Sequence, residues 1–180
     1  MKMWDDCKIR RHVAEDDLSN FTCGDDDLDD FIRNDAVFYA EERLASNYIM
    51  TSDEGLLAYF SLANDRISFH DFNTLTEFNR FRRKKFVNSK RIKGYPAVKV
   101  CRLAVDVRSK GLGVGTFLLD FIKMFLYRKT KSACRFITVD ANPDAVPFYQ
   151  KNGFQQLSKD SYTCKRTIPM YFDLSEMKRI

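Results

Sequence analysis

The sequence predicts a single α/β (α+β) domain, and three observations support this prediction. The chain has 180 residues with 44% apolar content, which suffices for one substantial core but is short for two. Short apolar, strand-like runs alternate with segments that have a helical period. No linker, low-complexity tract or internal repeat interrupts the chain. We therefore expect one domain over residues 1–180, in which helices flank a sheet.

The first part of the chain predicts a strand, a helix and a hairpin. The run "CKIRRHVA" is typical of a strand, and the acidic cluster that follows Cys23 is typical of a helix start. We expect this helix over residues 25–43, with a buried stripe formed by Leu28, Phe31, Ile32 and Phe38. The runs "SNYIMTS" and "GLLAYFSLA" flank the turn signal Asp53-Glu54-Gly55, which predicts a hairpin.

The second part of the chain alternates helices and strands. A polar stretch over residues 71–91 is predicted to be helical, and "AVKVCRLAV" to be a strand. A helix with a regular apolar face is expected after the glycines at 111–115, followed by the strand "CRFITVD". A short helix should carry Pro147 in its first turn and end at Asn152-Gly153. The runs "GFQQL" and "RTIPMYFDL" are expected to be the last strands.

Composition narrows the class of protein. No apolar run approaches the ~20 residues of a membrane span, and the N-terminus lacks a secretory hydrophobic region. We therefore expect a cytoplasmic protein that does not enter a membrane. Its five cysteines are widely spaced, and only His12 and His70 could add nitrogen ligands. This pattern predicts reduced, buried structural thiols and no metal site, with a nucleophilic cysteine paired with one of the two histidines as the alternative.

Charge is distributed unevenly along the chain, which has a net charge of +5. Residues 79–102 contain no carboxylate, whereas aspartates crowd residues 25–30. The basic run is either a solvated helix face or a surface for an anionic partner, with Phe81 and Phe86 interleaved among its cations.

Three of the seven glycines lie within five residues, at Gly111, Gly113 and Gly115, between a predicted strand and a predicted helix. Such a turn offers unpaired N–H groups and the positive end of a helix dipole to an anionic ligand. A P-loop is excluded because no Gly-Lys-Ser or Gly-Lys-Thr is present, and the spacing does not fit the dinucleotide-binding motif G-x-G-x-x-G. Close packing of the helix on the strand is the alternative role for these glycines.

The stretch "LAVDVRSKGLGVGTFLL", followed downstream by "NPDAVPFYQKNGF", resembles the GNAT superfamily of acetyl-CoA-dependent N-acetyltransferases. The resemblance implies a mixed, mostly antiparallel central sheet with splayed central strands, flanked by helices. It also implies that Leu103 and Val105 hold the acetyl end of acetyl-CoA, and that the glycine turn holds the pyrophosphate. Lys110 then replaces the glutamine or arginine that is usual in the motif, whereas an alternative frame begins at Arg108. We favour the first frame, which places the start of the helix at Gly115. The implied cofactor-binding residues are Leu103, Ala104, Val105, Lys110, Gly111, Leu112, Gly113, Val114, Gly115, Thr116, Asn142 and Tyr149.

The same resemblance implies two catalytic groups. Tyr149 corresponds to the family's tyrosine, whose hydroxyl approaches the thioester sulfur and acts as a general acid. The backbone N–H of Val105 would stabilise the oxyanion that forms when an amine attacks. Asn142 contacts the cofactor arm or caps the following helix. No histidine or glutamate is clearly positioned as a general base, so water is expected to accept the proton of the amine.

A finer resemblance extends over most of the chain. The stretches "FTCGDDDLDDFI", "GLLAYFSLA" and "GYPAVKVCRLAVD" are similar to the toxin branch that acetylates the amino group of aminoacyl-tRNA. Cys101 departs from the glycine usual there. This resemblance implies aminoacyl-tRNA and a small antitoxin protein as partners, and a homodimer is left open. The implied nucleic-acid contacts are Arg80, Arg82, Arg83, Lys84, Lys85, Lys90, Arg91 and Lys93. A small amine or a protein as acceptor, and a non-catalytic acyl-CoA-binding module, remain as alternatives.

Overall fold

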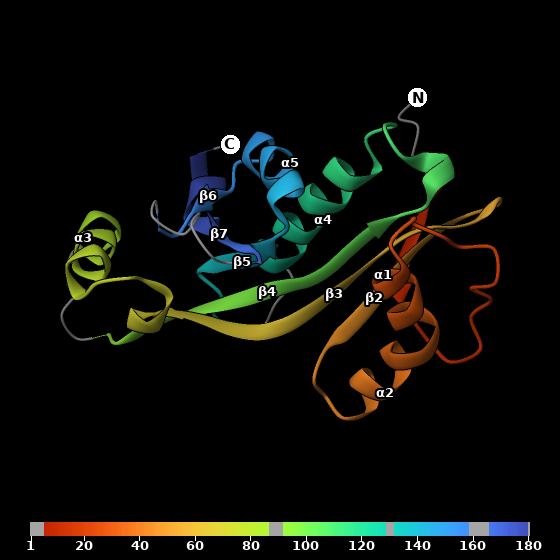
Figure 1. Ribbon diagram of the computed structural model, residues 1–180, viewed down its shortest axis with the longest axis horizontal. Helices are drawn as coiled ribbons and strands as arrows, with labels where there is room; N and C mark the ends of the chain where they lie inside the picture. The colour runs from red at the N-terminus through yellow and green to blue at the C-terminus, as the bar shows by residue number, and fades with distance from the viewer. Residues whose placement is uncertain (1–5, 87–91, 129–131, 159–165, 180) are drawn as a thin grey trace. The chain divides into compact units, whose positions relative to one another are not determined.

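The computed structural model describes residues 6–86, 92–128, 132–158 and 166–179 (Figure 1). Within these ranges the strands form one sheet in the order β1-β2-β3-β4-β5-β7-β6. Their bounds are β1 Lys8–Arg11, β2 Ser46–Ser52, β3 Gly55–Ser68, β4 Gly94–Val105, β5 Phe136–Ala141, β6 Gln155–Gln156 and β7 Ile168–Asp173. Strands β4 and β5 pair in parallel, whereas the pairs β1–β2, β2–β3, β5–β7 and β6–β7 are antiparallel. The predicted mixed, mostly antiparallel sheet is confirmed.

The helices match the expected segments, with shorter bounds. They are α1 Asp26–Asp30, the π-helix η1 Phe31–Asp35, α2 Ala36–Glu41, α3 Leu75–Lys85, α4 Val114–Arg128 and α5 Val146–Lys151. Single turns of 3₁₀ helix are η2 Phe69–Asp71, η4 Val107–Ser109 and η5 Pro143–Ala145, and η6 covers Leu174–Arg179. The side chains of Asp25 and Thr74 cap α1 and α3 by accepting the N–H groups of Leu28 and Glu77. No helix in the described residues is both long and apolar enough to span a membrane.

The π-helix η1 corrects one expectation about the first helix. Phe31 and Ile32 are buried as predicted, but Phe38 is 56% exposed. In η1 the N–H of Ala36 donates to the carbonyl of Phe31, five residues earlier. A π-helical segment turns less per residue than an α-helix, so the residues that follow it are rotated relative to the original stripe. The prediction of a buried Phe38 is therefore wrong, because it assumed an unbroken period of 3.6 residues.

The chain divides into two compact units, and each has its own core. The first comprises Met1–Ala63 and Val100–Phe121, and the second comprises Asn64–Lys99 and Ile122–Ile180. The core of the first unit gathers Phe21, Cys23, Phe31, Ile32, Ala36, Ile49, Leu56, Tyr59 and Ala104. The core of the second gathers Ile67, Phe72, Phe78, Tyr95, Ala97, Phe136 and Tyr171. Burying each large side chain contributes about 1.5–3 kcal/mol, so both cores are substantial.

In the first unit a buried polar network fixes the β2–β3 hairpin against α2. Asn47 donates from Nδ2 to the carbonyl of Ala36, and its Oδ1 accepts the hydroxyl of Ser61 at 2.6 Å. At the tip, Ser52 pairs with Gly55, which leaves Asp53 and Glu54 as the turn. The predicted hairpin is confirmed.

Candidate active site

The glycine turn connects β4 to α4 in the first unit. Gly111 and Gly113 have φ angles of +80° and +89°, which glycine adopts without the strain that a side chain would bring. A Cβ atom added at either position would meet no atom within 4 Å. Packing of the helix on the strand therefore does not explain these two glycines. Their backbone faces open space, where a ligand can approach it closely.

The start of helix α4 adds electrostatic attraction for an anion. The helix begins at Val114, one residue before the predicted start at Gly115. Its first turn has N–H groups without intrahelical partners, and its 15 residues align a dipole whose positive end lies at the turn. Lys110 and Leu112 on the turn are exposed, and Leu112 is exposed by 51%. The junction combines open backbone with a partial positive charge.

Strand β4 places the other residues expected to bind the cofactor directly before this turn. Ala104 is 3% exposed and lies in the core of the first unit, whereas Leu103 and Val105 are half-buried. Because successive side chains of a strand point to opposite faces, Leu103 and Val105 share the face opposite to Ala104. Residues 103–116 are thus one continuous strand-turn-helix segment.

Asp106 is a functional candidate that the sequence did not single out. It is fully buried, and it binds the guanidinium of Arg108 through Nε at 2.7 Å and Nη2 at 3.1 Å. Burial alone would raise the pKa of Asp106, but the hydrogen bonds from Arg108 and Thr22 outweigh it and hold the pKa below its ordinary value. Arg108 and Lys110 are both exposed, but the Arg108 guanidinium is bound by Asp106, which favours Lys110 as the cation that would meet an anion at the turn.

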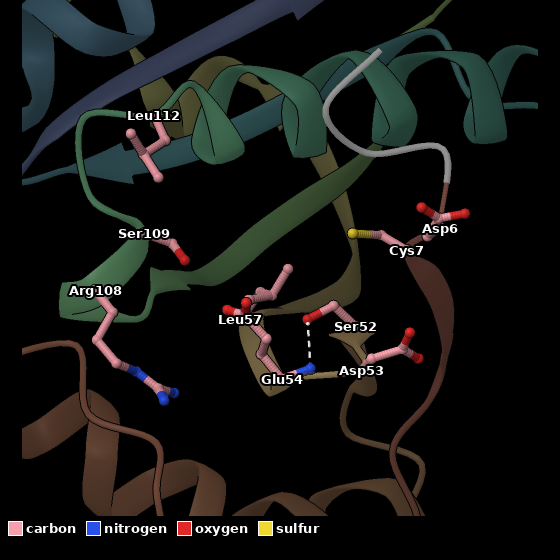
Figure 2. A pocket seen from close by; sticks show the side chains of 9 residues that line it. All are labelled: Asp6, Cys7, Ser52, Asp53, Glu54, Leu57, Arg108, Ser109 and Leu112. Atoms are coloured by element: carbon pink, nitrogen blue, oxygen red, sulfur yellow. Dashed lines mark hydrogen bonds between the residues drawn. The ribbon is translucent and has the colours of Figure 1, made fainter. Parts of the chain in front are cut away.

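A pocket of about 380 Å³ adjoins the turn (Figure 2). Figure 2 shows Arg108, Ser109 and Leu112 of the turn on one side, with the hairpin and the N-terminal segment on the other. The lining residues from those two elements are Asp6, Cys7, Ser52, Asp53, Glu54 and Leu57. Burial, together with Asp6 and Asp53, raises the pKa of the Cys7 thiol, which stays protonated at neutral pH. Three carboxylates make this pocket unsuitable for phosphate, so an anion is expected on the open backbone of the turn instead.

Tyr149 and Asn142 lie in the second unit. Tyr149 is on α5 and is 7% exposed, and its ring packs edge-on against Phe148 and Phe154. Burial raises the pKa of Tyr149 to about 12, so its phenol keeps its proton throughout the neutral range. Asn142 is exposed at the start of η5, and its side chain makes no capping hydrogen bond there. Its amide is therefore not used as a helix cap.

The ends of α5 follow the sequence signals. Pro147 lies in the first turn, where its missing N–H removes no helical bond. The helix ends at Lys151, and Gly153 follows with a φ angle of +82°. The side chain of Asn152 donates to the carbonyl of Phe148 at 2.8 Å. These contacts give Tyr149 a fixed place in a helix of six residues.

The cations of the basic run, which is also in the second unit, lie on different faces of α3. Arg80, Arg83 and Lys84 are exposed on one face, and Lys93 is exposed beyond the helix. Lys85 points the other way and forms ion pairs with Asp173 at 2.9 Å and Glu176 at 3.5 Å. Arg82 is half-buried, with its guanidinium 5.4 Å from the centre of the Phe78 ring. Lys90 and Arg91 lie outside the described residues.

The aromatic side chains of this run contribute to packing. Phe81 and Phe86 pack against the core of the second unit, and the Phe86 ring stacks on Tyr95 with centroids 4.1 Å apart. They are not interleaved with exposed cations, as the linear sequence had suggested. Among the described residues, no group of three or more histidine, cysteine or acidic side chains is arranged to hold a metal ion.

Comparison with solved structures identifies proteins of similar fold. The chain is similar to KacT, in a variant with tyrosine replaced by phenylalanine, with 19% identity, a TM-score of 0.76 and coverage of 97% of this chain and 98% of that one. It is similar to AtaT complexed with acetyl-methionyl-tRNAfMet, with 20% identity, a TM-score of 0.77 and the same coverage. AtaTR bound with acetyl-CoA matches with 21% identity, a TM-score of 0.74 and coverage of 97% and 98%.

Sequence comparison gives a family but no curated relative. No curated protein matches the chain. The family model described as the acetyltransferase (GNAT) domain matches residues 76–171, more than half of the chain, including the glycine turn and Tyr149. The chain therefore belongs to the GNAT acetyltransferase family.

Proposed function

We propose that this protein transfers the acetyl group of acetyl-CoA to a primary amine, and that the amine is the amino group of an aminoacyl-tRNA. The observation that carries the first half is the open turn at Gly111 and Gly113, at the start of α4. Open N–H groups and a helix dipole are suited to the pyrophosphate of coenzyme A. AtaTR, which has a similar fold, is bound with acetyl-CoA in its solved structure, which supports the same ligand here.

The proposed reaction is a direct attack of the amine on the thioester. Acetyl-CoA supplies the activated acetyl group, and the strand residues Leu103 and Val105 hold it. The backbone N–H of Val105 stabilises the negative charge that develops on the carbonyl oxygen. Tyr149 donates its proton to the departing thiolate, for which a pKa of about 12 keeps the phenol protonated. The amine loses its own proton to water.

The tRNA acceptor is supported by the cationic face of α3 and by one comparison. Arg80, Arg83 and Lys84 are exposed together, and Lys93 adds a fourth exposed cation of the same run. Clustered cations of this kind bind the phosphate backbone. AtaT was solved with acetyl-methionyl-tRNAfMet, and also with the C-terminus of its antitoxin AtaR. We therefore propose aminoacyl-tRNA as acceptor and a small antitoxin as protein partner.

A small-molecule amine or a protein amino group is the second candidate acceptor. It is favoured by the fact that Lys85 is engaged in ion pairs and Arg82 packs on an aromatic ring, which leaves fewer exposed cations than the run suggests. A non-catalytic acyl-CoA-binding module is the third candidate.

One assay separates these candidates. The protein is incubated with radiolabelled acetyl-CoA and charged total tRNA, and in parallel with polyamines and with a peptide mixture. We expect label on charged tRNA and none on uncharged tRNA, because only the former carries the amino group. Label on polyamines or peptides alone would leave the acetyltransferase standing and reject the tRNA acceptor. Binding of acetyl-CoA without transfer to any amine would favour the non-catalytic module.

A further inference from the structure

A short loop, Thr22 to Gly24, lies between two buried carboxylates in the first unit. Asp106 is fully buried at the start of the glycine turn, and Asp29 on α1 is 5% exposed. Neither side chain belongs to the groups proposed to touch acetyl-CoA or the acceptor. A buried carboxylate is costly unless it is well bonded, so the bonds of each reveal what it holds in place.

Asp106 bonds in two directions. Its Oδ1 accepts the backbone N–H of Arg108 at 2.9 Å, and the Arg108 guanidinium reaches both carboxylate oxygens. Its Oδ2 also accepts the backbone N–H of Thr22 at 3.4 Å. The backbone strengthens this link, because the N–H of Val107 donates to the carbonyl of Thr22 at 2.8 Å. Asp106 thus connects the residues before Gly111 to the loop from Thr22 to Gly24.

Asp29 holds the same loop from the other side. Its Oδ2 accepts the hydroxyl of Thr22 at 2.6 Å, and its Oδ1 accepts the N–H of Cys23 at 2.8 Å. The hydroxyl oxygen of Thr22 in turn accepts the N–H of Gly24 at 3.3 Å. A Cβ atom added at Gly24 would lie 3.5 Å from Val107 and 3.8 Å from the Lys110 ammonium. Thr22 is therefore bonded to the residues before the glycine turn, and Gly24 lies close to Val107 and Lys110.

We propose that Asp106 and Asp29 are positioning residues for the glycine turn, and that through Thr22 they couple acetyl-CoA binding at this turn to helix α1. This inference rests on the proposed function. The two glycines with positive φ make the turn entropically costly to order, and only one of its ends is fixed by α4. Asp106 fixes the other end before the ligand arrives, which lowers the cost of binding. Ordering of the turn by the ligand in turn restrains the loop and α1.

Two variants and one matched control test the proposal. Asp106→Asn removes the charge and turns one acceptor into a donor that faces N–H groups. Thr22→Val keeps the shape of the side chain but removes its hydroxyl bond to Asp29. Asp16→Asn is the control, because Asp16 likewise binds an arginine (Arg10), accepts the backbone N–H of Val13 and lies in the same unit, and neither of these bonds involves the glycine turn. Calorimetry, steady-state kinetics and hydrogen exchange are measured on all four proteins.

The expected results separate positioning from general stability. Asp106→Asn should raise the Kd and the KM for acetyl-CoA by about 10- to 100-fold, since a hydrogen-bonded charge is lost, whereas kcat should change by less than about threefold. Thr22→Val should raise them by about two- to tenfold. Asp16→Asn should leave both unchanged. In the wild type, acetyl-CoA should slow amide exchange at residues 107–116 and at residues 22–29, and in Thr22→Val only at the former.

Other outcomes would reject either the positioning role alone or the proposed function as well. If Asp106→Asn does not fold, Thr22→Val and the exchange data decide alone. Equal Kd values in wild type and Thr22→Val, or protection of residues 22–29 that persists in that variant, would reject the positioning role but leave the proposed function intact. A wild-type protein that binds no acetyl-CoA would reject the proposed function and this inference together.

Discussion

The glycine turn and helix α3 are the two regions expected to hold anions, and they differ in which atoms offer the binding groups. At the turn the groups are backbone N–H donors, and the structure keeps Gly111 and Gly113 open to a ligand. On α3 the groups are long side chains, and the helix turns Lys85 and Arg82 toward its packed side. A run of cations along the chain therefore does not by itself predict a continuous cationic surface, because helical periodicity separates neighbours onto different faces.

The largest expected effect comes from a single side chain that belongs to neither region. Tyr149→Phe removes one hydroxyl and little volume, so the buried packing against Phe148 and Phe154 should persist. Loss of general acid catalysis should lower kcat by about 10² to 10⁴. Single-turnover acetylation and calorimetry with acetyl-CoA measure the rate and the affinity separately. An unchanged Kd with a rate within twofold of wild type would make Tyr149 a packing residue only.

The backbone site is tested by a pair of glycine substitutions. Gly113→Val puts a branched side chain where φ is +89° and where the pyrophosphate is expected, so the affinity for coenzyme A should fall by at least about tenfold. Gly55→Val is the matched control, because Gly55 has a φ angle of +108° and equally open surroundings at the hairpin. Both variants bear a backbone strain of about 1–2 kcal/mol.

Only the first variant should lose affinity for coenzyme A, as measured by calorimetry on protein whose folding has been checked by circular dichroism. Equal affinity losses in the two variants would show that strain alone acts. Unchanged affinity for coenzyme A in folded Gly113→Val would contradict the assignment of the glycine turn as the pyrophosphate site.

The side-chain region is tested by separating the faces of α3. The triple variant Arg80→Gln, Arg83→Gln and Lys84→Gln should weaken tRNA binding and lower the log-log salt slope by roughly one unit per cation removed. Lys85→Gln should leave this slope unchanged, but lower the free energy of unfolding by about 1.5–3 kcal/mol, because Asp173 loses a charged partner. Filter binding at several salt concentrations and denaturant titrations measure the two quantities. A salt slope that falls in Lys85→Gln but not in the triple variant would show that Lys85, and not the exposed face of α3, contacts the tRNA.

The smallest expected effect is the absence of a decline in rate at alkaline pH. A general acid works only while protonated, and an ordinary tyrosine with a pKa of about 10 would be half ionised at pH 10. Burial raises the pKa of Tyr149 to about 12, so kcat should stay level from about pH 8 to pH 10. A profile of kcat against pH, with folding monitored by fluorescence, checks this. A rate that halves well below pH 10 in folded protein would mean that Tyr149 is less buried in solution, or that another group titrates.

The sequence predicts best where a residue type has one dominant structural use. The Asp53-Glu54-Gly55 hairpin, the first-turn Pro147 and the Gly153 helix end all appear as expected, because each depends on local backbone geometry. The prediction of a buried Phe38 fails because the π-helical segment before it is not specified by any local sequence pattern. Cys101 is exposed where a buried thiol was expected, since the type of residue does not tell which face of β4 is covered.

Asp106 shows why part of the candidate site escapes sequence reasoning. The spacing of Asp106 and Arg108 matches none of the motifs considered in the sequence, so the pair carries no distinctive signal. Its importance comes from Thr22, which is 84 residues away and reaches Asp106 only in the folded chain. Long-range polar contacts of this kind require the structure.

The π-helical segment over residues 31–35 also bears on how the chain could change in length. A π-type hydrogen bond spans five residues where an α-type bond spans four, so the segment accommodates one extra residue as a local bulge. Here Phe31 and Ile32 in the bulge stay in the core, and Phe38 after it is exposed. A chain one residue shorter at this point should therefore carry an unbroken α-helix.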